Sequence, residues 1–205
     1  MQTSMVFSQR EWPAVDPRPH KGGPDLDDCW VLSAIQAVNV TSPWYRLVGC
    51  KAFRHAAGDP DDGVNDGGNV TEIIAGIEGC YPELKGRAHG HRGVAWIDLK
   101  NDLDHHRPVS VAVLSSELPP GLRYGFEGLH QVTLAQKANG QLLIANPLAQ
   151  PYARWDRIEP NDVRDAVMTY GERRSGSRSA WYVTLPTDVE ALAIWRGHDE
   201  PNPED

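Results

Sequence analysis

The stretch "GGPDLDDCWVLSAIQAVN", residues 22–39, places a cysteine between a run of acids and an apolar segment. Aspartate is a favoured N-cap residue, so we predict a helix that begins at Asp27 or Asp28 and ends near residue 41. The apolar positions at helical spacing are Val31, Ala34, Ile35 and Val38. Cys29 then lies in the first turn of this helix.

Cys29 shares one side of that helix with Ser33 and Gln36, opposite the apolar positions. A structural cysteine would normally join the apolar side, so this placement indicates a thiol that faces a groove. Helix N-termini stabilise thiolates and thereby activate cysteine as a nucleophile. The alternative is a small buried apolar residue, because cysteine is among the most buried residue types.

The second half of the chain changes to short β-rich runs, which are "PVSVAVL", "HQVTLAQ", "QLLIANP" and "AWYVTLP". The segment "KANGQ" predicts a hairpin between the second and third runs. His130 opens one strand, where we expect its ring at an edge rather than in the core, and Asn146 ends the partner strand. The hairpin would bring them together, so His130 is a candidate base and Asn146 a candidate for orienting it.

Further helices are predicted over residues 43–55 and from Asn69, which Glu72 completes as a capping box. A short helix is expected at "DLKNDL", and "GCYPELKGRAHGHRG" is interpreted as a loop. Helices first and strands later predict an α+β fold. We expect an extended arm over 1–27, one domain over 28–190, helical to about 105 and β-rich over about 106–186, and a tail over 191–205.

The motifs occur in a known order: "DDCWVLSA", "NDGGNVTEIIAGI", "RPVSVAVL", "LHQVTLA" and "IANPLAQ". In this order they resemble the papain-like cysteine peptidases over roughly residues 20–185. His130 follows Cys29 by 101 positions, which is shorter than the roughly 130 expected for papain itself. The spacing therefore suits compact bacterial and phage relatives, such as the bacteriocin-processing peptidases.

This resemblance implies a helical lobe packed against a β-sheet lobe, with Cys29 facing His130 across a cleft and Asn146 as the third triad member. It also implies substrate contacts from Trp30 and from the two glycines Gly67 and Gly68.

The family places an oxyanion-hole glutamine six residues before the nucleophile, where this chain has Gly23. Losing one such donor costs on the order of 10² to 10³ in rate. Three acids, Asp25, Asp27 and Asp28, also oppose thiolate formation unless they are turned away. Trp155 is the candidate to shield the His130–Asn146 pair.

The formal charge of −8 argues against nucleic acid or an anionic membrane as a partner. We expect no cofactor. Zinc ligation by His89, His91, His105 and His106 lacks suitably spaced cysteine or carboxylate partners. The acidic turn "DPDDGVNDGG" misses the ligand order of a calcium loop. No signal or membrane-spanning segment is evident, so we expect cytoplasmic synthesis.

The sequence therefore predicts a thiol hydrolase that cleaves a peptide or amide bond. By analogy with the compact relatives, its substrate would be peptidoglycan or a phage or bacterial protein, with virion or assembly proteins as further partners. The alternative is a non-catalytic structural or binding module, such as a virion or assembly component, that keeps the fold while its oxyanion hole has decayed.

Overall fold

A computed structural model describes residues 28–41, 48–59, 68–137, 139–148, 155–187 and 190. The fold is α+β, as predicted. Six strands form one antiparallel sheet in the order β1-β6-β2-β3-β4-β5. The strands are β1 (His89–Val94), β2 (Val109–Leu114), β3 (Leu129–Gln136), β4 (Leu142–Ala145), β5 (Asp156–Arg157) and β6 (Ala180–Thr184).

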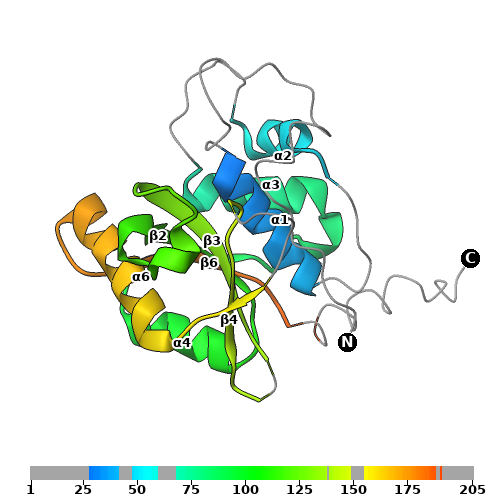
Figure 1. Ribbon diagram of the computed structural model, residues 1–205. Coiled ribbons are helices and arrows are strands. Elements are labelled where there is room, and N and C mark those ends of the chain that lie inside the picture. The colour runs from blue at the N-terminus through cyan, green and yellow to red at the C-terminus, as the bar shows by residue number, and fades with distance from the viewer. Residues whose placement is uncertain are drawn as a thin grey trace, which may run out of the picture.

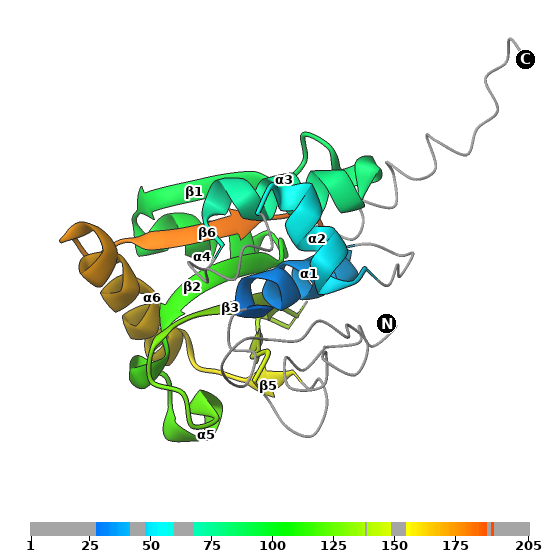
Figure 2. The same cartoon turned by 90° about the horizontal axis from the view of Figure 1, so that it is seen from above.

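Helices cover both faces of this sheet (Figures 1 and 2). The helices are α1 (Cys29–Thr41), α2 (Cys50–Ala57), α3 (Val70–Cys80), α4 (Trp96–Asp104), α5 (Pro120–Arg123) and α6 (Pro160–Ser175), with short 3-10 turns at η3 (Pro82–Leu84) and η4 (Ser115–Glu117). The first three helices share one apolar core, which includes Val183 of β6. The helices α4 and α6 share a second core, which includes Val111 and Val132 on the opposite face of the sheet.

The helix that carries Cys29 lies at the centre of the molecule. Nearly every residue of α1 is buried, because α2 and α3 cover one side of it while β2 and β3 cover the other. Figure 2 shows α1 lying against β3. The helical lobe therefore packs on the sheet through α1, as the resemblance implied.

Local signals placed α3 correctly. The side chain of Asn69 accepts hydrogen bonds from the backbone N–H groups of Thr71 (2.9 Å) and Glu72 (3.3 Å). The Glu72 carboxylate accepts one in return from the Asn69 N–H, at 2.7 Å. Both halves of the predicted capping box are present, so three of the N–H groups at this helix end are paired.

The β3–β4 hairpin is also confirmed. Ala135 pairs with Leu143, and Lys137 N–H donates to the carbonyl of Gln141 at 3.0 Å. Gly140 supplies a positive φ of 80°, which is the role predicted for the glycine of "KANGQ". The hairpin sets the register that brings the end of β4 to the beginning of β3.

Two expectations about the elements need correction, and one helix was not predicted. The predicted loop "GCYPELKGRAHGHRG" contains η3 and the edge strand β1, which forms by pairing with β6 from the other end of the chain. The helix predicted over 43–55 is α2, which begins only at Cys50. The helix α6 was not predicted, although Pro160 at its start and Gly176 at its end are ordinary boundary signals.

The predicted division into a helical part and a β-rich part is interrupted for the same reasons, because β1 lies in the first part and α6 in the second. None of the helices in the described part of the chain is both long and apolar enough to cross a membrane.

Candidate active site

The candidate base His130 and the residue predicted to orient it, Asn146, are in direct contact. His130 Nε2 lies 2.9 Å from Asn146 Oδ1, and both side chains are buried. His130 is the second residue of β3, and Asn146 directly follows β4. The hairpin register therefore brings together two residues that are 16 positions apart, as the sequence predicted.

The contacts of Asn146 determine the tautomer of His130. The Leu148 N–H donates to Asn146 Oδ1 at 2.9 Å, and Asn146 Nδ2 donates to the carbonyl of Leu122 at 2.8 Å. A backbone N–H can only donate and a carbonyl can only accept, so these two contacts fix the orientation of the amide. Asn146 Oδ1 then accepts from His130 Nε2–H. In the neutral ring, Nδ1 is left as the proton acceptor.

His130 is buried more deeply than expected. Its ring was predicted at an edge rather than in the core. The residue is nevertheless only 3% exposed, because β3 is an interior strand of the sheet. Burial disfavours the charged ring and lowers the pKa of His130 to about 4, against the partly opposing hydrogen bond with Asn146. The imidazole is therefore neutral at neutral pH.

An aromatic ring, that of Phe126, packs against His130. The Phe126 ring lies 5.5 Å from the His130 ring at 59°. It folds against Gly128, where an added Cβ would lie 2.7 Å from Phe126 Cζ. Trp155, which lies just before β5, stays a prediction for the shielding of the His130–Asn146 pair.

Cys29 is the first residue of α1 and is half-buried. None of the three cysteines, all of which lie in the described part of the chain, forms a disulfide. Cys50 is fully buried in the first core. The helix N-terminus favours negative charge on a side chain placed there, which is the environment predicted for the thiol.

Two residues on the polar side of α1, Ser33 and Gln36, pack on the sheet. Ser33 and Gln36 are both buried, and they contact Thr133 on β3. Helical spacing predicted that Ser33 and Gln36 share one side of α1, but it could not tell that they pack on the sheet. What the structure shows is that the helix bearing Cys29 is joined to the strand bearing His130.

One of the acids near the thiol forms an ion pair with Arg54, a residue that no motif of the sequence singled out. Asp28 is buried, and its Oδ1 accepts from Arg54 Nε and lies 2.7 Å from a second nitrogen of the same guanidinium. Arg54 also binds Asp59 and lies 5.4 Å above the Trp30 ring. The charge of Asp28 is thus compensated, while Gly23, Asp25 and Asp27 lie outside the described residues.

Trp30 packs inside the helical lobe instead of lining a substrate surface. It is 1% exposed and makes an edge contact with Phe53, at 5.8 Å between ring centroids. An added Cβ on Gly68 would lie 2.1 Å from the Trp30 indole, so only glycine allows the backbone to lie on this ring. Gly67, the other predicted substrate contact, lies outside the described residues.

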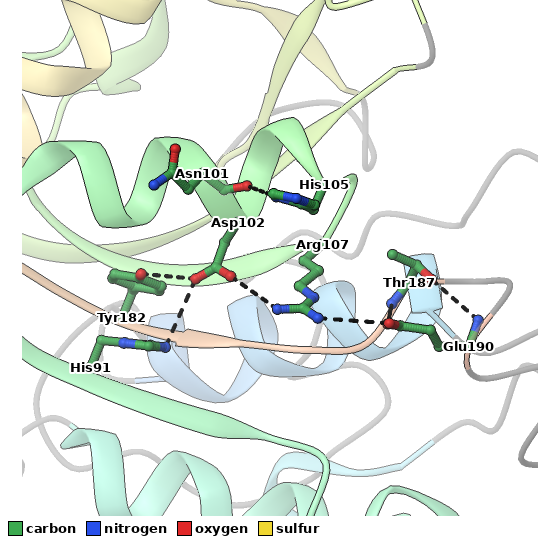
Figure 3. Close-up of polar contacts among 8 residues, drawn as sticks. All are labelled: His91, Asn101, Asp102, His105, Arg107, Tyr182, Thr187 and Glu190. Atoms are coloured by element: carbon green, nitrogen blue, oxygen red, sulfur yellow. Dashed lines mark hydrogen bonds and ion pairs between the residues drawn. The ribbon is translucent and has the colours of Figure 1, made fainter.

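Two of the histidines considered for zinc, His91 and His105, make other contacts (Figure 3). His91 stacks on Tyr182 at 4.5 Å, and its Nε2 lies 3.8 Å from Asp102. Tyr182 donates to the same carboxylate at 2.8 Å, and His105 contacts the carbonyl of Asn101 within α4. Within the described residues, no three histidine, cysteine or carboxylate side chains gather in a way that could hold a metal ion.

Comparison with known proteins gives a structural match. A scan of protein-family models and a search of curated proteins found nothing similar. Among solved structures, a Bacillus anthracis protein assigned as a C39-like peptidase matches with a TM-score of 0.51 at 12% identity, over 78% of this chain and 89% of that one. At this sequence identity, the match shows a similar fold and nothing about activity. The chain therefore shares the α+β, papain-like fold of that C39-like structure.

Proposed function

We propose that this protein is a papain-like thiol hydrolase in which Cys29 is the nucleophile, His130 the base and Asn146 the residue that orients the base. The observation that carries the proposal is the buried hydrogen bond between His130 and Asn146. A histidine locked by an amide oxygen in the tautomer that leaves Nδ1 as an acceptor is prepared to take a proton.

In the proposed mechanism, Nδ1 of His130 removes the thiol proton of Cys29. The thiolate attacks the carbonyl carbon of a peptide or amide, and the imidazolium returns its proton to the leaving amine. Water, deprotonated by the same nitrogen, then hydrolyses the thioester and releases the acid. The negative charge that forms beside the ring offsets the burial that otherwise keeps His130 neutral.

The fold match supports a peptidase more than other acyl transferases. Peptidoglycan, or a phage or bacterial protein, remains the narrower prediction for the substrate. Incubation with purified peptidoglycan and with an unfolded protein separates these classes, because release of stem peptides and release of new protein termini are distinct products.

The first test is alkylation of the thiols by iodoacetamide, followed residue by residue by peptide mass spectrometry. Cys80 is half-buried, as Cys29 is, and serves as the internal reference for the rate of alkylation. At pH 7 we expect Cys29 to react at least tenfold faster than Cys80, because an activated cysteine is more thiolate than one of ordinary pKa.

The matched control is His130→Gln, which keeps a polar side chain but removes the base. It should reduce the rate at Cys29 to about that at Cys80 and leave the rate at Cys80 unchanged. Equal rates at the two thiols in the wild type, together with no effect of His130→Gln, would contradict the proposal and favour the non-catalytic module.

A further inference from the structure

A buried polar network joins α1 to the sheet between the two apolar cores. Thr133 Oγ1 donates to the carbonyl of Ser33 at 2.8 Å and lies 3.2 Å from the amide oxygen of Gln36. Ser33 Oγ lies 2.8 Å from Ser110 Oγ on β2, which also accepts from Gln131 Nε2 at 3.1 Å. All five side chains are buried.

Thr133 is the centre of this network. A hydroxyl carries one proton, and the shortest contact of Thr133 is to a backbone carbonyl that can only accept. Thr133 therefore binds the helix backbone itself, while its oxygen remains available to Ser33 Oγ at 3.2 Å. The same residue thus holds both the backbone and a side chain of α1.

The network lies one helical turn from the proposed nucleophile and a short step along the strand from the base. Ser33 follows Cys29 by four residues in α1, and Thr133 follows His130 by three in β3. A helix and a strand are stiff over such lengths, so the position of α1 along β3 sets the separation of Cys29 from His130.

Apolar packing does not fix that position well, because the hydrophobic effect has no direction. A buried hydrogen bond does, since sliding α1 along β3 would leave buried donors and acceptors unpaired, which is unfavourable. A displacement of about 1 Å at a catalytic pair costs on the order of 10² in rate.

We propose that Thr133 is a positioning residue, which fixes the register of α1 on β3 so that Cys29 and His130 stay at reacting distance. This inference rests on the proposed function of the pair. Thr133 touches no reacting atom in this scheme and acts only through the two elements that it joins.

The test uses the nearly isosteric variant Thr133→Val, with Thr133→Ser as the conservative variant that keeps the hydroxyl. Thr184→Val is the matched control, because Thr184 is also a buried strand threonine of this sheet but its hydroxyl has no hydrogen-bond partner among the described residues. Iodoacetamide alkylation of Cys29 is followed across pH 5–9, and thermal unfolding of each variant is recorded.

We expect Thr133→Val to slow alkylation of Cys29 by about tenfold to a hundredfold and to shift its pH profile toward that of Cys80. Thr133→Ser should stay within about threefold of the wild type, and Thr184→Val should leave the profile unchanged. A purely structural role would lower the unfolding temperature without moving the pH profile.

The two possible failures are distinguishable. If Cys29 of the wild type depends on His130 but Thr133→Val behaves as Thr184→Val does, the positioning role is wrong while the proposed function stands. If Cys29 of the wild type is alkylated as slowly as Cys80, and His130→Gln does not change that rate, the proposed function is wrong and the positioning role fails with it.

Discussion

At the scale of single residues, Asn146 decides which nitrogen of His130 carries the proton. It does so because its own amide is held from both ends, by the Leu148 N–H and the Leu122 carbonyl. These two contacts, together with the one to His130, fix which ring nitrogen of His130 is protonated. The distance between His130 and Asn146 alone would not determine it.

The burial of His130 predicts a pH dependence of stability. The pKa of His130 is lowered from 6.5 to about 4 in the folded protein, so the unfolded chain binds the proton more tightly. The contribution of His130 to the free energy of unfolding should be complete above about pH 6.5. It should fall by about 3 kcal/mol as the pH drops to about 4. Urea unfolding at a series of pH values measures this dependence.

His130→Gln is the reference for that experiment, because other titrating groups contribute equally to both proteins. The difference in free energy of unfolding between the two should change between pH 6.5 and 4 and be constant above that range. A difference that stays constant throughout would show that the ring keeps its ordinary pKa in the folded state.

At the scale of elements, the contact between α6 and β6 depends on one glycine. An added Cβ at Gly171 would lie 2.0 Å from the backbone oxygen of Ser179, which directly precedes β6. The nearest atom belongs to the backbone, so a rotamer change cannot relieve the overlap. This explains why a helix that begins and ends with ordinary signals also contains a glycine in its interior.

Gly171→Ala should lower the free energy of unfolding by about 1–3 kcal/mol, because overpacking outweighs the gain of up to about 1 kcal/mol in helix propensity. Chemical denaturation measures the change. Gly121→Ala is the control, since this helical glycine has open space around it, and there the substitution should be neutral or stabilising. Equal stability of the two variants would mean that α6 moves away from β6 without cost.

At the scale of the whole molecule, α1 lies between the helical core and the sheet, whereas β1 forms an exposed edge. Amide hydrogen exchange should therefore be slowest in α1, which exchanges through global unfolding, and faster in β1 through local opening. Exchange followed by mass spectrometry tests this order. Similar rates in the two elements would indicate that the helical lobe opens separately from the sheet.

The sequence by itself determined the parts that depend on near neighbours. The helix after Asp28, the capping box at Asn69 and the hairpin at Gly140 were predictable, because helical periodicity, cap chemistry and turn geometry act over a few residues. The hairpin in turn made the pairing of His130 with Asn146 predictable, since it joins adjacent strands.

Only the tertiary structure decided what depends on distant partners. Nothing local to β1 marks it as a strand, because its pairing partner β6 lies about 90 residues further on. Helical spacing grouped Ser33 with Cys29, but only packing on Thr133 turned that side of α1 toward the sheet. Likewise, the charge of Asp28 was visible in the sequence, whereas Arg54, which neutralises it, is brought to it by the packing of α2. Burial and pairing depend on contacts between elements that are distant in the sequence, so only the tertiary structure determines them.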